Sequence, residues 1–323
     1  MLSATEQLQE YCDQYLFFRR TGGALLRETE KILRRFIKFC SPYLGNECCV
    51  PEEAVKVWGA RHSNETDSTI YKKANEVRAF AEYLQSKGVK AYVGERPRSK
   101  ANDYVPYIFT NAELAALFNA ADSIPLNHVY PGRKVTLPLI FRMIYACGLR
   151  ESEAVNLTVE RVDIKDGILT ILDAKFDKDR LVSIHPVLLE KLIEYSKTPY
   201  FPQNPKSPFF VSAKGTAYSP KSIYDAFRIF LLTAGISHGG RGKGPRVHDL
   251  RHTFAVHCLR NWVRNGEDLS VAMPYLSAYL GHTGLQNSQI YLHLTAEMFP
   301  DIVESVEQKF DVLPDWSELR ASN

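Results

Sequence analysis

The sequence predicts a mainly helical protein with two domains and one small β-hairpin, and three observations support this fold class. Apolar residues recur at helical spacing over residues 1–88 and over most of the chain after residue 105. Two short runs of β-forming residues, 167–172 and 180–184, flank a charged turn, which is typical of a hairpin. A basic stretch with one proline and two glycines, residues 87–100, separates the two helical regions.

The first domain spans residues 1–95 and is predicted to be a small bundle of helices. Its apolar side chains form stripes with a period near 3.6 residues, and basic side chains lie between them. Lys72 and Lys73 lie outside the stripe of the last helix, so they form either a solvated face or a surface that faces DNA. The helices expected here run from Leu25 to Cys40, from Pro51 to Trp58, and from Asp67 or Ser68 to a stop at Gly88.

Residues 96–104 are predicted to link the domains. This segment carries Arg96, Arg98 and Lys100. A basic linker can lie along a phosphate backbone, although charged linkers without that role are also common.

Residues 105–323 are predicted to form the second domain. Thr110 and Glu113 form a capping-box pattern at the start of its first helix. The apolar run 135–147 predicts a buried helix that ends at Gly148. Further expected elements are helices at 151–157 and 186–195, a candidate strand at 209–212, and helices from Ser219 onward.

Composition excludes several classes of protein. The chain has 40 basic and 37 acidic residues, and a net charge of +3 is too small to indicate nucleic-acid binding by itself. The six cysteines show no C-x-x-C pair and no zinc-ligand spacing, so we expect reduced thiols. No apolar run approaches the ~20 residues of a membrane span, and the first residues lack the parts of a signal peptide. We therefore expect a cytoplasmic protein.

Cationic side chains, imidazoles and one tyrosine occur in the second domain in a pattern that fits phosphodiester chemistry. Attack on a phosphodiester needs a deprotonated nucleophile, positive charge at the non-bridging oxygens, and a proton for the leaving oxygen. Guanidinium groups can bind phosphate oxygens, imidazoles can donate hydrogen bonds or move protons, and a tyrosine with a pKa of about 10 needs help to ionise. The residues concerned are Arg150, Lys175, His248, Arg251, His282 and Tyr291.

These residues stand in five short motifs. The motifs are Gly148-Leu149-Arg150-Glu151-Ser152-Glu153, Lys175 in the hairpin turn, His248-Asp249-Leu250-Arg251, Leu280-Gly281-His282, and Tyr291 followed by Leu292-His293. Each motif alone is weak, but the five in this order are specific. Over most of residues 105–300 the chain resembles the tyrosine recombinases, also called phage-type integrases, which include the Xer proteins.

The resemblance implies a strand-transfer reaction on DNA. Tyr291 would be the nucleophile and would form a 3′-phosphotyrosyl link with a free 5′-hydroxyl, and a second 5′-hydroxyl would reverse the step. Arg150, Arg251, His248 and His282 would bind the reacting phosphate. The covalent bond conserves the energy of the phosphodiester, so neither a nucleotide cofactor nor a metal is implied.

The resemblance also assigns the proton for the leaving oxygen to a lysine of the hairpin turn. Lys175 is the first candidate, and Lys178 is the alternative in the same turn. Ala174 and Phe176 replace the glycines that commonly flank this lysine in the family. Glu153 is expected either to support Arg150 or to cap its turn, without contacting the substrate.

A basic, glycine-rich loop precedes His248. It contains Arg241, Lys243 and Arg246 among four glycines. Glycine lets a backbone approach another polymer closely, so the loop is either a DNA contact or a flexible surface loop. It is not a P-loop, because Gly244 is followed by Pro245.

The family's architecture fits the predicted elements. The first domain would be a helical, SAM-like core-binding domain, and the second the catalytic domain, the two clamping double-stranded DNA at inverted core sites. A homotetramer on DNA would exchange strands through a Holliday junction, with an accessory directionality protein as a further partner. The tail 311–323 carries exposed apolar groups and is expected to dock on a neighbouring subunit, with packing against its own subunit as the alternative.

The spacing of the motifs favours one biological role. The 34 residues from His248 to His282 exceed the compact Xer type, which favours an integrase of a mobile element. The alternatives are Xer-type resolution of chromosome or plasmid dimers, a relaxase that resembles type IB topoisomerases, and a catalytically silent DNA-binding relative.

Overall fold

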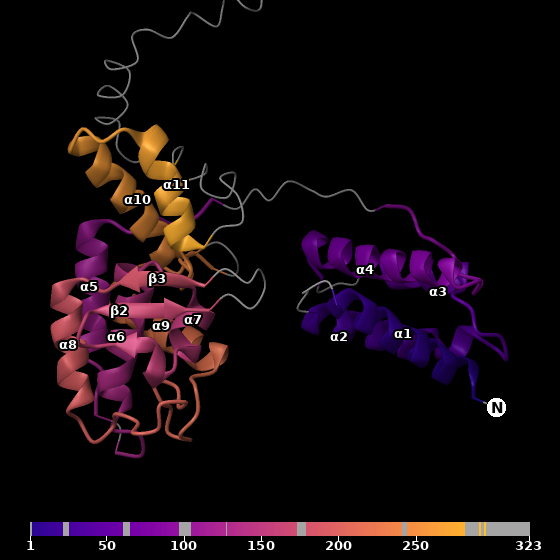
Figure 1. The fold of residues 1–323 in the computed structure, drawn as a ribbon, viewed down its shortest axis with the longest axis horizontal. Coiled ribbons are helices and arrows are strands. Elements are labelled where there is room, and N and C mark those ends of the chain that lie inside the picture. Colours follow the sequence, from indigo (N-terminus) through magenta and orange to yellow (C-terminus); the bar gives the residue numbers. More distant parts are fainter. Residues whose placement is uncertain are drawn as a thin grey trace, which may run out of the picture. The chain divides into compact units, whose positions relative to one another are not determined.

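The computed structural model of the chain shows two compact units. The first lies before residue 97 and the second begins at residue 105 (Figure 1). Each unit has its own hydrophobic core. The fold is mainly helical, with one small sheet among the residues that the structure describes, as the sequence predicts. The described residues are 2–21, 26–60, 65–96, 105–126, 128–172, 179–240, 244–281, 291 and 294.

The first unit is a bundle of helices around a shared apolar core. Leu8, Phe36 and Phe80 come from three different helices and are fully buried. The last helix begins where Thr66 accepts a hydrogen bond from the backbone nitrogen of Thr69, so Thr66 is its cap, whereas the sequence predicted Asp67 or Ser68 as the cap. The helices are α1 (Ala4–Thr21), α2 (Arg27–Cys40), α3 (Glu52–Gly59) and α4 (Asp67–Ser86), with a 3-10 turn, η1 (Ser41–Tyr43), after α2.

The second unit is built around helix α6. This helix is apolar on most sides and contacts α5, α7, α8 and α10, which explains its nearly continuous hydrophobic sequence. The capping box predicted at Thr110 and Glu113 is present at the start of α5. The helices of this unit are α5 (Asn111–Asp122), α6 (Arg133–Ala146), α7 (Glu151–Asn156), α8 (Pro186–Ser196), α9 (Pro220–Thr233), α10 (Asp249–Arg264) and α11 (Leu269–Leu280), with a 3-10 turn, η2 (Val159–Arg161).

A three-stranded antiparallel sheet lies against these helices. Strand β2 is central, and Ile171 pairs with Arg180 at the end of the hairpin where the connecting segment begins. Alternate residues point inward, because Leu169 and Val182 are fully buried while Leu181 is exposed. The strands are β1 (Val162–Asp163), β2 (Ile168–Ile171) and β3 (Arg180–Ser183).

The prediction of a strand at 209–212 is wrong. Phe209 and Phe210 are fully buried, but their segment forms no ladder, and a single bridge joins Pro208 to Thr158. The aromatic rings fill the core under Tyr195, so burial rather than strand pairing explains this apolar run. The short strand β1 was not predicted, because a two-residue strand has no periodicity to detect.

Two further findings concern composition. All six cysteines are unpaired, as the absence of paired spacings predicted. Within the described ranges, each helix is too short or too polar to cross a membrane.

Candidate active site

Arg150 lies at the turn from α6 to α7, just after the chain leaves α6 through Gly148. Its backbone nitrogen donates to Oε2 of Glu153 at 2.8 Å, so Glu153 caps the first turn of α7. Its side chain donates from Nη1 to Oε1 of Glu153 at 2.7 Å and from Nη2 to the carbonyl oxygen of Gly281 at 2.7 Å. The side chain keeps 34% of its surface exposed, so the guanidinium is held in place and still reachable.

Glu153 also binds a second arginine. Arg180, the first residue of β3, donates from Nη1 and Nη2 to the two carboxylate oxygens at 3.1 and 2.8 Å. Its Nε donates to the carbonyl oxygen of Tyr279 at 2.8 Å. Burial alone would raise the pKa of Glu153, but the hydrogen bonds and charges of Arg180 and Arg150 hold that pKa below its usual value. Glu153 is therefore an anion that joins β3 to α7.

Arg251 is the third arginine of the site and lies in the first turn of α10. Only 1% of its surface is exposed. Its Nη1 donates to the carbonyl oxygen of Gly148 at 2.8 Å, and its Nη2 donates to the carbonyl oxygen of Leu280. Burial and the nearby charge of Arg150 lower the pKa of Arg251 to about 10, which leaves the guanidinium charged at neutral pH.

Two glycines let these elements approach one another. Gly148 has a φ of +59°, and an added Cβ would lie 2.6 Å from the ring of Phe254. Gly281 ends α11 in the left-handed conformation, and an added Cβ there would lie 2.9 Å from Nη1 of Arg180. The carbonyl groups of both glycines accept hydrogen bonds from arginines of the site, so backbone geometry and side-chain placement depend on each other.

Tyr291 points its hydroxyl toward α10. The phenol oxygen lies 3.0 Å from Nδ1 of His252, and the ring packs among apolar side chains that include Leu259 and Leu276. The residue is 1% exposed. Burial raises the pKa of Tyr291, while the charges of Arg251 and Arg150 and a hydrogen bond from Arg251 act in the opposite direction.

His248 precedes α10 and stands next to His252. Their ring centroids lie 4.6 Å apart, with the ring planes nearly perpendicular. Nearby protein atoms partly shield the imidazole of His248 from water, although the side chain remains exposed. This desolvation and the positive charges of Arg251 and Arg150 lower the pKa of His248 to about 4. At neutral pH His248 is therefore a neutral imidazole, which can donate one hydrogen bond and accept another.

The structure thus brings together five of the residues that the sequence singled out. Arg150, Glu153, His248, Arg251 and Tyr291 are spread over 141 positions of the chain. They converge where the end of α6, the start of α10 and the end of α11 meet. Lys175, Lys178, His282, Arg98, Lys100, Arg241, Lys243 and the tail 311–323 lie outside the described residues.

The predicted DNA contacts of the first domain differ from one another in the structure. Lys72 is exposed, and so is Arg96 of the linker. Lys73 is 9% exposed, because its Nζ donates to Glu65 at 2.8 Å and lies over the ring of Trp58. Since Glu65 within the same unit already pairs with the ammonium group of Lys73, we do not retain Lys73 among the proposed DNA contacts. In the second unit Arg246, before α10, is exposed.

Sequence reasoning missed two residues of this site. Arg180 was assigned only to the start of a strand, and His252 was left to structural roles. Both contacts join residues far apart in the chain, 27 positions for Arg180 and Glu153 and 39 for His252 and Tyr291. A spacing of four positions between His248 and His252 was the one available signal, since it places both rings on one face of a helix.

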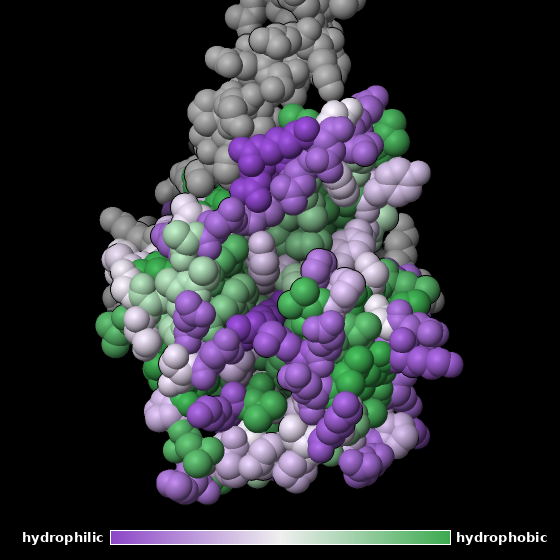
Figure 2. Space-filling view, turned by 90° about the vertical axis from the view of Figure 1, so that its left-hand side faces the viewer, coloured by the Kyte–Doolittle hydropathy of each residue, from purple (hydrophilic) through white to green (hydrophobic). Residues whose placement is uncertain are grey.

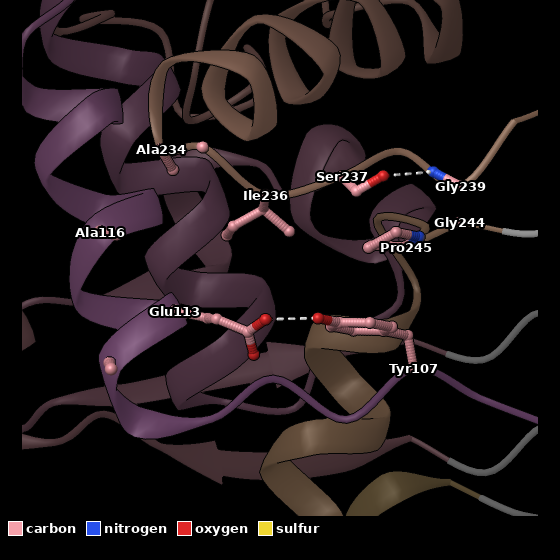
Figure 3. Close-up of a pocket in the computed structure, with 11 residues that line it drawn as sticks. Tyr107, Glu113, Ala116, Ala234, Ile236, Ser237, Gly239, Gly244 and Pro245 are labelled. Atoms are coloured by element: carbon pink, nitrogen blue, oxygen red, sulfur yellow. Dashed lines mark hydrogen bonds between the residues drawn. The ribbon is translucent and has the colours of Figure 1, made fainter.

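Two concavities in the second unit lie apart from these residues. One opens between α5, α6, α8 and α10, and His257 and Tyr145 line it. Figure 2 views the side that carries α5, α8 and α10, where hydrophobic residues are exposed between hydrophilic ones. The other lies between α5 and the segment after α9, where the hydroxyl of Tyr107 donates to Glu113 (Figure 3). Among the described residues, no group of three or more histidines, cysteines or carboxylates is placed to hold a metal ion.

The fold and the site define a class of protein. A helical domain that gathers guanidiniums, two imidazoles and a tyrosine hydroxyl has groups that can bind and attack a phosphodiester. Residues 108–298 match the profile of the phage integrase family, and the chain belongs to this family of tyrosine recombinases, whose members transfer DNA strands.

Relatives and solved structures agree with this assignment. The protein y4rB of Sinorhizobium fredii, whose name describes an integrase/recombinase, is 28% identical over 92% of this chain and 96% of its own length. The tyrosine recombinase XerA of Pyrococcus furiosus is 28% identical over 71% of each chain. A structure of XerH bound to a palindromic difH substrate shares the fold, with a TM-score of 0.61 and 21% identity over 95% of this chain and 84% of that one.

Proposed function

We propose that this protein is an active site-specific recombinase that cuts and rejoins DNA through a 3′-phosphotyrosyl intermediate at Tyr291. The convergence of Arg150, Arg251, His248 and Tyr291 on one point carries the proposal. A relative that had lost catalysis would have no requirement to hold two guanidiniums on backbone carbonyl groups beside a buried tyrosine hydroxyl. Family membership supplies the class of reaction.

In the proposed reaction, Tyr291 is the nucleophile and the arginines stabilise the negative charge on the phosphate. The phenol oxygen of Tyr291 attacks phosphorus, the bond from phosphorus to the 5′ oxygen breaks, and the 5′ oxygen takes up a proton. Arg150 and Arg251 are proposed to bind the non-bridging oxygens, and carbonyl and carboxylate acceptors hold both side chains in place without substrate. Charge placed in advance at the point where negative charge develops is often the largest contribution to catalysis.

The remaining roles rest on the family resemblance. Lys175 is proposed to protonate the 5′ oxygen, with Lys178 as the alternative, and His282 to donate a hydrogen bond to the phosphate. Arg180 is the first residue of the strand that follows this turn, and its hydrogen bonds to Glu153 and Tyr279 fix the start of that strand.

Double-stranded DNA with inverted core sites is the proposed substrate. XerH has been solved bound to a palindromic difH substrate, and a lambda integrase dimer has been solved bound to a COC′ core site. The lambda integrase structure shares the fold at a TM-score of 0.59, with 16% identity over 88% of this chain and 94% of that one. Exposed Lys72, Arg96 and Arg246, together with Arg98, Lys100, Arg241 and Lys243, are the proposed contacts to its backbone.

Assembly and biological role are part of the same proposal. We propose a homotetramer on DNA in which the tail 311–323 docks on a neighbouring subunit, and an accessory protein sets direction. Integration or excision of a mobile element is favoured by y4rB and y4rE, two relatives of nearly full coverage whose names describe integrase/recombinases. Dimer resolution is the second candidate, because other relatives are named XerA and XerD.

A nicked suicide duplex tests the reaction. The DNA is first selected for binding from a pool of duplexes with random inverted-repeat arms. A nick in the spacer then lets the short fragment with the 5′-hydroxyl diffuse away after cleavage, so the covalent adduct cannot be reversed. The wild-type protein should accumulate as a covalent adduct on denaturing gels, and Tyr291→Phe should form none. An adduct of the phenylalanine variant would refute the nucleophile, and absence of an adduct from wild type would refute the activity.

A further inference from the structure

His252 is the imidazole that touches the proposed nucleophile. Its Nδ1 lies 3.0 Å from the phenol oxygen of Tyr291, and the two ring centroids lie 5.6 Å apart. His252 lies one helical turn beyond His248 on α10, and the two rings are in edge contact. The start of α10 therefore presents two adjacent imidazoles, and His252 is the one that contacts the phenol.

We propose that His252 is a catalytic residue that takes the phenolic proton when Tyr291 attacks and returns it when Tyr291 leaves. This inference rests on the proposed function and deepens it, because it names the proton acceptor of the same reaction. The acceptor atom is Nδ1, and the ring carries its own proton on Nε2 before the step.

The other groups around Tyr291 are poor acceptors. Arg150 and Arg251 have no lone pair to offer, because a guanidinium only donates. Glu153 is committed to Arg150 and Arg180 through both of its oxygens. Among the described residues of the site this leaves the two imidazoles, and His252 is the imidazole that lies within hydrogen-bonding distance of the phenol.

The environment of Tyr291 requires such an acceptor. The residue is 1% exposed, so bulk water does not solvate a phenolate at this position. Burial raises the pKa of Tyr291, which makes spontaneous loss of the proton at neutral pH rarer than for a free phenol. Arg251 and Arg150 stabilise the phenolate once the proton has moved to the imidazole.

The proposed step conserves atoms and charge. As the bond from the phenol oxygen to phosphorus forms, the O–H bond breaks and Nδ1 of His252 gains the proton, giving an imidazolium. The 5′ oxygen leaves with the electron pair of the broken P–O bond and is protonated by the proposed lysine acid. In the rejoining step the imidazolium protonates the departing phenol oxygen, so the same residue acts as base and then as acid.

The chain contains a matched control on the same helix. His257, also on α10, is 6% exposed and has its Nδ1 at 3.0 Å from the hydroxyl of Tyr145. We assign a structural role to this pair, because Tyr145 lies on α6 and lines the concavity between α5, α6, α8 and α10, apart from the arginines. His257→Asn therefore disturbs the same kind of hydrogen bond without touching the proposed nucleophile.

The first experiment compares covalent adduct formation by His252→Asn, His257→Asn and wild type. Asparagine places an oxygen near the position of Nδ1, so it keeps an acceptor but cannot bind the proton. We expect adduct formation on the suicide duplex to be about 100-fold slower for His252→Asn, with DNA binding unchanged. We expect His257→Asn to cleave at the wild-type rate. His252→Gln serves as a second variant, should His252→Asn fail to fold.

The second experiment separates proton transfer from positioning. Incorporation of 3,5-difluorotyrosine at position 291 gives a more acidic phenol, which depends less on a base. If His252 accepts the proton, the difference in rate between His252→Asn and wild type should shrink by about tenfold with the fluorinated nucleophile. An unchanged difference would mean that His252 only holds the ring in place, and the proposal would be wrong.

The outcomes also separate this proposal from the proposed function. A wild-type adduct together with an equal or faster rate for His252→Asn would leave the recombinase intact and overturn the role of His252. Such a result would mean that the hydrogen bond only holds Tyr291 in a resting conformation before DNA binds. Absence of the wild-type adduct would overturn both.

Discussion

At the scale of single residues, Gly148 determines how closely the arginines can gather. Its φ of +59° lies in the left-handed region, and its Cα faces Phe254 and Leu280 at close range. Its carbonyl oxygen accepts from Arg251 at 2.8 Å. A side chain here would be strained in the backbone and would push α10 away from the turn that carries Arg150.

Replacing this glycine should therefore damage both stability and the site. We expect Gly148→Ala to lower the free energy of unfolding by about 3 kcal/mol, measured by urea denaturation, because strain in the backbone adds to overpacking. Gly215→Ala is the control, since Gly215 also has a positive φ, of +69°, but open space around it. The control should cost about 1 kcal/mol. Equal losses in both variants would contradict the steric argument.

The sequence predicted the members of the site better than their contacts. Motif order identified Arg150, His248, Arg251 and Tyr291, because chemistry restricts which side chains can serve at those points. The partners of Tyr291 and Glu153 could not be predicted, because they depend on how α10 and β3 pack against the turn after α6. Such contacts follow from tertiary packing, which no local pattern encodes.

At the scale of elements, Arg180 connects β3 with α7 and α11. Its three nitrogens donate to both oxygens of Glu153 and to the carbonyl of Tyr279, and its side chain is 9% exposed. A lysine could make only one of these contacts at good geometry. The bond to Tyr279 also fixes the last turn of α11, whose carbonyl at Leu280 holds Arg251.

We expect Arg180→Lys to slow adduct formation on the suicide duplex by about tenfold, because the arginines of the site lose a common anchor. Arg142→Lys is the control. Arg142 makes a similar two-point contact with Asp122, at 2.8 and 2.6 Å, outside the site. The control should alter thermal stability and leave the cleavage rate unchanged. Equal rates for the two variants would show that Arg180 serves stability alone.

The contact between α6 and α10 should make stability depend on pH. Burial, with the charge of Arg260, lowers the pKa of His257 to about 4, against about 6.5 for an unfolded histidine. Between these values the unfolded chain binds one more proton than the folded one, so stability is present above pH 6.5 and falls as the pH drops toward 4. The expected slope is about 1.4 kcal/mol per pH unit, measured by urea denaturation. In His257→Asn this part of the slope should disappear, and an unchanged slope would assign it elsewhere.

Elements with strong local signals were predictable from the sequence. The capping box at Thr110 and Glu113 and the stop at Gly148 are set by local hydrogen bonds and backbone preference. The run 209–212 was not predictable as a loop, because a buried loop and a buried strand have the same apolar composition. Only the packing of Phe209 and Phe210 under Tyr195 distinguishes them.

At the scale of the whole molecule, the hydrophobic clusters of the first unit share no residue with those of the second. The core of the first unit joins α1, α2, α3 and α4, and the larger core of the second unit joins the sheet to its helices. Aromatic contacts such as Phe36 with Trp58 and Tyr15 with Phe80 lie within the first unit. Each unit therefore has the interior that an independently folding domain requires.

We accordingly expect a fragment of residues 1–104 to fold alone. Its helical circular dichroism should be lost in one cooperative urea transition, with a slope of about 1 kcal/mol per molar urea, the value for a small domain. Phe80→Ala should lower the midpoint, because Phe80 is fully buried between α4 and α1, whereas Phe17→Ala should not, because Phe17 is 70% exposed. A gradual loss of helix without a midpoint would mean that the first unit needs the second in order to fold. The fragment carries 17 basic and 14 acidic residues, so any binding to DNA should be weak and should fall steeply with salt.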